Sequence, residues 1–334
     1  MSTLTQAAPS APSRIRWHRP LLWLAAAMAA LAVFALVARF IDPRIVTDLN
    51  AWDKPLKFAL STVIYAVTWS WLIGQMGRWR RVAGAAGWVI TITLAVELII
   101  ITGAAAYGTT SHFNVTTPLN TVMWSIMGAS ITVLWVASFV AAIVLLRNPL
   151  GDPARTLAIR LGAFISIIGL GLGFLMTSPT AQQLSNFQGI AGAHTVGLAD
   201  GGPGLPILGW STVAGDLRVP HFVGMHALQA IPLALIALEL LSRRVVLLRD
   251  ITVRARLVWI MAFGYLGVVA VVTWQALRGQ SIVQPDALTL WAVAGLVTAG
   301  VAALAVVLMS GATKRAPDAS ATADQDAYAL SATG

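Results

Sequence analysis

The residues best suited to chemistry lie in an apolar stretch that runs from Val219 to Leu241. His226 and Gln229 are three positions apart, so a helix places both on one face, whereas His221 points well away from His226. Pro232 lacks the N–H that a helix needs and predicts a kink about one turn below His226. Because polar side chains are costly in hydrocarbon, this stretch predicts one wall of a polar chamber within a membrane.

Glu97 is the acidic residue set deepest in an apolar run. At about 1.5 Å per residue, it lies roughly 13 Å below the outer end of a span at 84–106, and His226 lies roughly 9 Å deep in its own span. The two side chains are therefore expected to meet. Glu97 is also expected to be coupled to Lys57, because each charge otherwise lacks a counter-charge in a low-dielectric region. Glu97, His226 and Lys57 are the candidate catalytic residues.

Two plainer interpretations of these charges stay open. Glu97 could be neutral and hydrogen-bonded to a neighbouring helix, since burial favours the protonated carboxyl. Lys57 could extend its ammonium to the lipid head groups, as lysines near helix ends commonly do.

Histidine side chains gather on one expected side of the membrane. Neutral imidazole is a ligand of haem iron and of divalent metals. Four of the five histidines are expected on the outer side: His112, His194, His221 and His226. A metal site would combine His226 with His194, although no metal-binding spacing is present. A bound haem or other cofactor would be contacted by His226, His112, Gln229 and Arg278.

The composition predicts the class of protein. Hydrophobic residues make up 57% of the chain and charged residues 10%, and the charges fall between apolar runs of membrane-spanning length. We expect an all-α polytopic membrane protein, a bundle of about eight transmembrane helices within a single domain at 20–310. A disordered cytoplasmic tail at 1–19 and a flexible cytoplasmic tail at 311–334 would flank it. The expected spans are about 21–40, 55–76, 84–106, 118–146, 156–177, 220–241, 256–277 and 287–309.

The distribution of positive charge predicts the orientation. Sixteen of the 22 lysines and arginines fall on one side of the expected spans and six on the other, so both termini are expected in the cytoplasm of a plasma (inner) membrane. We therefore attribute the net charge of +9 to the positive residues that set the orientation in the membrane, and not to nucleic-acid binding. The absence of cysteine excludes disulfides, iron–sulfur ligation and thiol chemistry.

Several segments must position the chamber. A long extracytoplasmic loop at 178–219 between the fifth and sixth spans is expected to act as a lid. Residues 41–54 are expected to form an interfacial helix with Trp52 at head-group level. Two stripes are expected to face the bundle: Lys57, Ser61, Thr68 and Gln75 on the second span, and Gly162, Ser166, Gly169 and Gly173 for close packing on the fifth.

Three functions are compatible with these residues. The first is a haem- or metal-binding redox protein that acts on a lipophilic substrate such as a quinone. The second is a proton-coupled transporter or permease for a small polar solute, with Glu97 as the proton carrier. The third is a non-catalytic sensor or assembly factor that uses the long outer loop.

Overall fold

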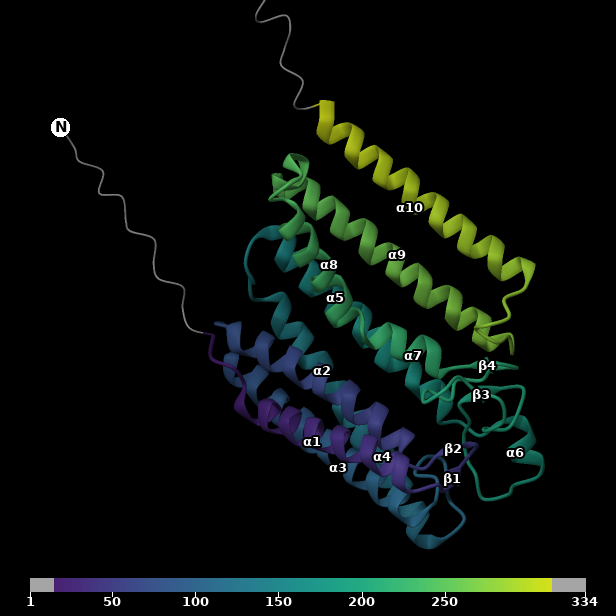
Figure 1. The fold of residues 1–334 in the computed structure, drawn as a ribbon. Helices are drawn as coiled ribbons and strands as arrows, with labels where there is room; N and C mark the ends of the chain where they lie inside the picture. Colours follow the sequence, from purple (N-terminus) through teal and green to yellow (C-terminus); the bar gives the residue numbers. More distant parts are fainter. Residues whose placement is uncertain (1–14, 314–334) are drawn as a thin grey trace, which may run out of the picture.

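The structure, a computed structural model, describes residues 15–313, and these residues are almost entirely helical (Figure 1). The long helices are α1 (Arg19–Ile41), α2 (Asp53–Gln75), α3 (Arg80–Tyr107), α4 (Pro118–Leu146), α5 (Pro153–Leu172), α9 (Ile251–Leu277) and α10 (Ala287–Thr313). Seven helices are long and apolar enough to cross a membrane, the fifth being the helical stretch Pro153–Ser185 that begins with α5. Helices α7 (Arg218–Met225) and α8 (Ala227–Leu241) together form an eighth candidate, bent by 47°. The chain is a multi-pass membrane protein, so the expected all-α polytopic bundle is confirmed.

The helices form two packed groups joined along one seam. Helices α1 to α4 pack on one another, and α5 packs on α7, α8 and α9 (Figure 1). Helix α4 contacts α5 at the seam, and α10 lies along α9 at the edge of the array. The largest hydrophobic core fills the first group and includes Trp69, Leu72 and Leu145, together with Leu228 from α8. This arrangement leaves room between the groups at one end of the bundle.

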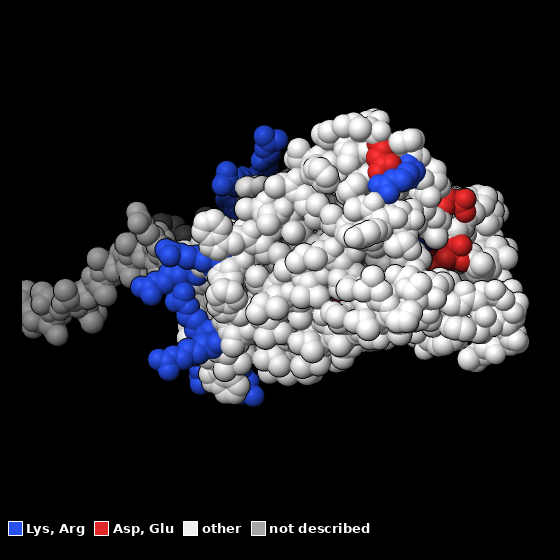
Figure 2. Space-filling model, turned by 90° about the horizontal axis from the view of Figure 1, so that it is seen from below, with Lys and Arg blue, Asp and Glu red and all other residues white. Residues whose placement is uncertain are grey.

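The two ends of the molecule differ. One end carries the connections α1–α2, α3–α4, α5–α7 and α9–α10, and we term it the loop end. It contains hairpin strands β1 (Ile45–Val46) and β2 (Leu49–Asn50), short helix α6 (Ala181–Ser185) and paired strands β3 (Thr195–Val196) and β4 (Gly215–Asp216). Lysine and arginine side chains gather at the opposite end, which we term the basic end (Figure 2). It contains the connections with Arg78, Arg147, Arg243, Arg244 and Arg249. The charge asymmetry supports cytoplasmic termini, which stay a prediction.

Local sequence explains where helices begin. The side chain of Thr117 accepts a hydrogen bond from the backbone N–H of Asn120 at the start of α4, and Asp152 accepts one from Arg155 at the start of α5. A proline follows each cap, at a position where the missing N–H has no helical partner to lose. Of the predicted tails, residues 1–14 and 314–334 lie outside the described residues, α1 begins at Arg19, and α10 extends to Thr313.

The segment expected as an interfacial helix is a β-hairpin, so that prediction is wrong. Thr47 and Asp48 both have positive φ angles, the geometry of a two-residue hairpin turn. Trp52 is buried and donates from its indole nitrogen to the Asp42 carboxylate, 2.8 Å away. Asp42 also accepts hydrogen bonds from Arg44. The side-chain bonds of Asp42 therefore close this turn against the bundle.

The bend in the sixth span lies at His226, six residues before Pro232, so the predicted position of the kink is wrong. Two carbonyls next to the bend are bonded by side chains of other helices: Tyr265 Oη donates to Val223 O at 2.6 Å, and Ser166 Oγ donates to Met225 O at 2.8 Å. Side-chain donors that occupy helical carbonyls permit a break at that point.

The predicted stripe of small residues on α5 packs against the bend at His226. A Cβ on Gly169 would lie 2.1 Å from the Gly224 carbonyl carbon, and one on Gly162 would lie 2.8 Å from the Ala227 oxygen. Backbones approach this closely only where side chains are absent. The expectation of close helix packing along this stripe is confirmed.

Candidate functional site

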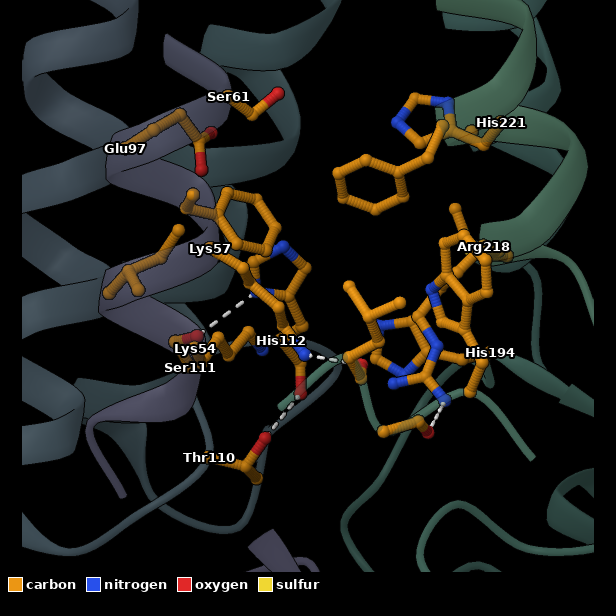
Figure 3. A pocket seen from close by; sticks show the side chains of 18 of the residues that line it. Lys54, Lys57, Ser61, Glu97, Thr110, Ser111, His112, His194, Arg218 and His221 are labelled. Carbon is orange, nitrogen blue, oxygen red and sulfur yellow. Dashed lines mark hydrogen bonds between the residues drawn. The ribbon is translucent and has the colours of Figure 1, made fainter. Parts of the chain in front are cut away.

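A cavity of about 740 Å³ lies between the two helix groups toward the loop end (Figure 3). Its walls come from α2, α3, α4, α5, α7 and α9, and its roof from residues 200–210 of the long loop. Apolar side chains dominate the lining, and polar groups converge on it from α2, α3, α7 and two loops. This combination is typical of small-molecule sites. The long loop therefore covers a cavity, as expected of a lid.

Two lysines of α2, Lys54 and Lys57, lie one turn apart on the cavity wall. Lys57 Nζ donates to the Leu208 carbonyl at 2.7 Å and lies 3.5 Å from that of Ile207. Within residues 15–313, neither lysine has a carboxylate at ion-pair distance. Their positive charges are thus available to a bound anion.

A third cation at the same end is already neutralised. Arg218, the first residue of α7, forms an ion pair with the buried Asp216 at 2.6 Å and donates to the Gly209 carbonyl at 2.5 Å. These contacts fix the roof of the cavity to the start of α7. Arg218 therefore shapes the polar end more than it supplies free charge.

Four histidines line the cavity, and each has its Nδ1 atom engaged. The pairs are His112 with Ser111 Oγ at 3.0 Å, His194 with Asp200 Oδ2 at 2.5 Å, His221 with Gly169 O at 2.8 Å and His226 with Gln229 Oε1 at 3.3 Å. The Nε2 atom of His226 lies 3.4 Å from Ser61 Oγ. For the other three, Nε2 is the ring nitrogen left for a ligand among the described residues. Anchored imidazoles of this kind can accept a proton or ligate a metal.

Two of these histidines, His112 and His194, lie in loops outside the spans. The centroids of their rings are 6.2 Å apart. Burial lowers the pKa of His112 well below its ordinary value, and positive charge from Lys54 and His194 lowers it further. Burial also lowers the pKa of His194, although the hydrogen bond to Asp200 opposes that shift. Both rings are therefore neutral near neutral pH.

Glu97 of α3 is 4% exposed, lines the cavity and receives no hydrogen bond at Oε1 from the described residues. The cation that acts on its charge is Lys54, whereas Lys57 is held by the roof carbonyls. No ion pair joins Glu97 to either lysine among the described residues, so the expected coupling of Glu97 to Lys57, direct or through water, stays a prediction. Figure 3 shows Glu97 and the two lysines on the same side of the cavity.

Most predicted site residues come together, and one does not. Lys57, Glu97, His112, His194 and His226 all line the cavity. Behind them, Gln229 joins His226 to Thr68 of α2, with Nε2 donating to Thr68 Oγ1 at 3.1 Å.

Arg278 lies outside the lining. It forms an ion pair with Asp286, and its guanidinium carbon is 4.5 Å from the centroid of the Trp274 ring. It cannot contact a cofactor in the cavity in this arrangement.

The sequence interpretation missed two cavity residues. His221 was expected to point away from His226, but it lines the same cavity because the bend at His226 interrupts the helical periodicity. Lys54 fell within the expected interfacial segment 41–54, although its spacing of three residues from Lys57 places both on one helical face.

The predicted metal site gains no further ligand. Among residues 15–313, no three histidine, aspartate or glutamate side chains are grouped closely enough to hold a metal ion. The metal ligands His226 and His194 therefore stay a prediction.

The cavity borders the lipid-facing surface of the bundle. Leu60 and Ile64 of α2 line the cavity and are 50% and 47% exposed, and Phe174 near the end of α5 is 38% exposed. In a bilayer, such apolar side chains contact acyl chains. Toward the basic end, Tyr65 bonds to Ser138 at 2.6 Å, and Trp69 and Leu72 are fully buried. The cavity thus has partly exposed apolar side chains in its lining and buried side chains toward the basic end.

No protein-family model, curated protein or solved structure matches this chain, so the function is argued from the cavity itself.

Proposed function

We propose that this membrane protein takes an amphipathic molecule with an anionic head group from the bilayer into the cavity. The observation that carries the proposal is the pair Lys54 and Lys57, which face a largely apolar cavity without a carboxylate partner among the described residues. Cations withdrawn from water are costly unless they are paired, and a phosphate or carboxylate supplies the missing charge.

The remaining walls suit the apolar part of such a molecule. Leucine and isoleucine side chains of α3 and α4 line the cavity: Leu94, Leu98, Ile101, Ile131 and Leu134. Leu60 and Ile64 continue this surface to the outside of the bundle. An acyl or prenyl chain can therefore lie across the wall of α2 while its head group contacts the lysines.

His194 gives this site a capacity for acid–base chemistry. Its Nδ1 is held by Asp200 at 2.5 Å, and Asp200 also accepts hydrogen bonds from the backbone N–H groups of His194 and Thr195. A neutral imidazole oriented by a carboxylate accepts a proton at its free nitrogen. A hydroxyl of the bound head group, or a water beside it, is the group that His194 would deprotonate.

A haem-binding redox protein is the second candidate, and the anchored histidines favour it. Haem ligation requires neutral imidazoles whose other nitrogen is hydrogen-bonded, as at His112, His194 and His221. Haem also carries carboxylates that the two lysines could bind. A quinone would then be the lipophilic substrate.

Proton-coupled transport receives less support. A permease needs a path to both sides of the membrane, and the cavity is closed toward the basic end by buried side chains such as Trp69 and Leu72.

One preparation separates these candidates. The protein is purified in mild detergent, its absorption spectrum is recorded, and bound lipid is extracted and quantified by mass spectrometry. We expect about one bound amphiphile with an acidic group per chain and no Soret band. The Lys54→Met/Lys57→Met double variant should lose the lipid, and Arg278→Gln, which removes a cation at the same end outside the cavity, should retain it.

A Soret band would favour the haem candidate. Equal lipid content in the wild-type protein and the double lysine variant would overturn the proposed function.

A further inference from the structure

Glu97 is a cavity group that the lysine site does not use. It is buried on α3 and lines the cavity, and its Oε1 atom has no hydrogen-bond donor among the described residues. Ser61, which lines the same cavity, is engaged with His226 at 3.4 Å. Lys54 acts on Glu97 through its charge but donates no hydrogen bond to it among residues 15–313.

A buried carboxyl oxygen without a donor is destabilising, and a ligand donor removes that cost. On the proposed function the ligand enters from the bilayer, and the donor can arrive with it. The same molecule would then contact the lysines through its anion and Glu97 through an N–H group.

The charges of the lining also favour a head group that carries both signs. Of the charged side chains that line the cavity, Arg218 is paired with Asp216, Asp200 is held by His194, and Asp48 accepts a hydrogen bond from the Gly202 N–H. Two cations and one acidic group are then left for a ligand: Lys54, Lys57 and Glu97. A phosphate offers a partner to the two lysines, and an ammonium on the same head group offers one to Glu97.

We propose that the bound molecule has an aminophospholipid-type head group, with its phosphate on Lys54 and Lys57 and its primary ammonium donating to Glu97. This inference rests on the proposed function, because it assigns the second half of the same head group. It goes beyond that function in naming Glu97 as the residue that selects an ammonium with N–H donors.

Phosphatidylethanolamine and phosphatidylcholine with identical acyl chains are the matched probes. Both carry a phosphate and a positive nitrogen, but the quaternary ammonium of phosphatidylcholine has no N–H to donate. Each lipid is titrated into the detergent-purified protein, and binding is followed by native mass spectrometry. A charge-assisted hydrogen bond predicts about tenfold tighter binding of phosphatidylethanolamine to the wild-type protein.

Two substitutions of Glu97 test the assignment, and one control matches them. Glu97→Leu should bind both lipids equally, and Glu97→Gln, which keeps the side-chain shape, should show a reduced preference. Thr102→Val is the control, because Thr102 Oγ1 is also buried without a partner on α3 but does not line the cavity. This variant should keep the wild-type preference.

The outcomes separate the two proposals. Equal binding of both lipids by the wild-type protein, or an unchanged preference in Glu97→Leu and Glu97→Gln, would overturn the role of Glu97 while lysine-dependent binding could still stand. If Lys57→Met binds both lipids as tightly as the wild-type protein does, the phosphate site itself is wrong.

Discussion

Lys57 of α2 donates a hydrogen bond from Nζ to the carbonyl oxygen of Leu208, 2.7 Å away and 151 positions later in the chain. The bond ties the wall of the cavity to its roof. Its partners at the roof are neutral carbonyls, so no counter-charge of the roof engages the Lys57 side chain. One side chain thus holds the lid and presents a cation.

Replacing Lys57 should therefore have two effects, and replacing Lys54 only one. Lys57→Met removes the bond to the roof and the charge, so limited proteolysis within residues 200–210 should become faster and lipid binding weaker. Lys54→Met removes a charge without a roof contact, so only lipid binding should weaken. Equal proteolysis rates in the two variants would contradict the proposed latch.

The contact between Gly169 of α5 and Gly224 of α7 should tolerate no larger residue. A Cβ on Gly169 would lie 2.1 Å from Gly224 C, so Gly169→Ala should destabilise the protein by about 1–3 kcal/mol and lower the melting temperature in detergent. Gly128→Ala on α4 is the matched control, because nothing lies within 4 Å of its Cβ position. Similar melting temperatures for both variants would show that α5 and α7 are packed less closely.

Acidification should destabilise the protein through His112. Burial lowers the pKa of this ring below its ordinary value of 6.5, so the unfolded chain binds the proton more tightly than the folded chain does. The contribution to stability is complete above pH 6.5 and is lost as the pH falls below it toward the folded-state pKa. Melting temperatures measured across this window should fall less steeply for His112→Gln, and parallel curves for the two proteins would contradict this origin.

The orientation is open to a direct test. A reporter that is active only outside the cytoplasm should give signal when fused after Gly197 at the loop end and none after Arg249 at the basic end. Reversed signals would place the cavity on the cytoplasmic side. The proposed lipid site would then face the other leaflet.

The sequence predicted the helices well because each lies in one apolar run bounded by charges. It failed where local bonds override that pattern. The hairpin at Thr47 depends on the side-chain contacts of Asp42, and the bend at His226 depends on Tyr265 and Ser166, which are distant in the sequence. Hydrophobicity carries no information on such partners.

The site was predicted only in part, because its loop contacts are also not encoded in the hydrophobic pattern. Depth along straight helices correctly brought Glu97, Lys57 and His226 to one cavity. It could not show that Lys57 bonds to a loop carbonyl or that Arg278 is occupied by Asp286. Those assignments depend on how loops fold back, which spacing within a helix does not specify.

Occupancy of the cavity by a lipid head group is measured most directly at a single introduced cysteine, because the chain contains none. Ser61→Cys places a thiol on the cavity wall, and Gly197→Cys places a control thiol on the loop end outside the lining. The rate of thiol modification is measured in vesicles with phosphatidic acid or with a diacylglycerol of identical chains. Phosphatidic acid should slow modification at position 61 but not at 197, diacylglycerol should not, and Lys54→Met/Lys57→Met should remove the protection. Equal modification rates with both lipids would contradict the binding of an anionic head group in this cavity.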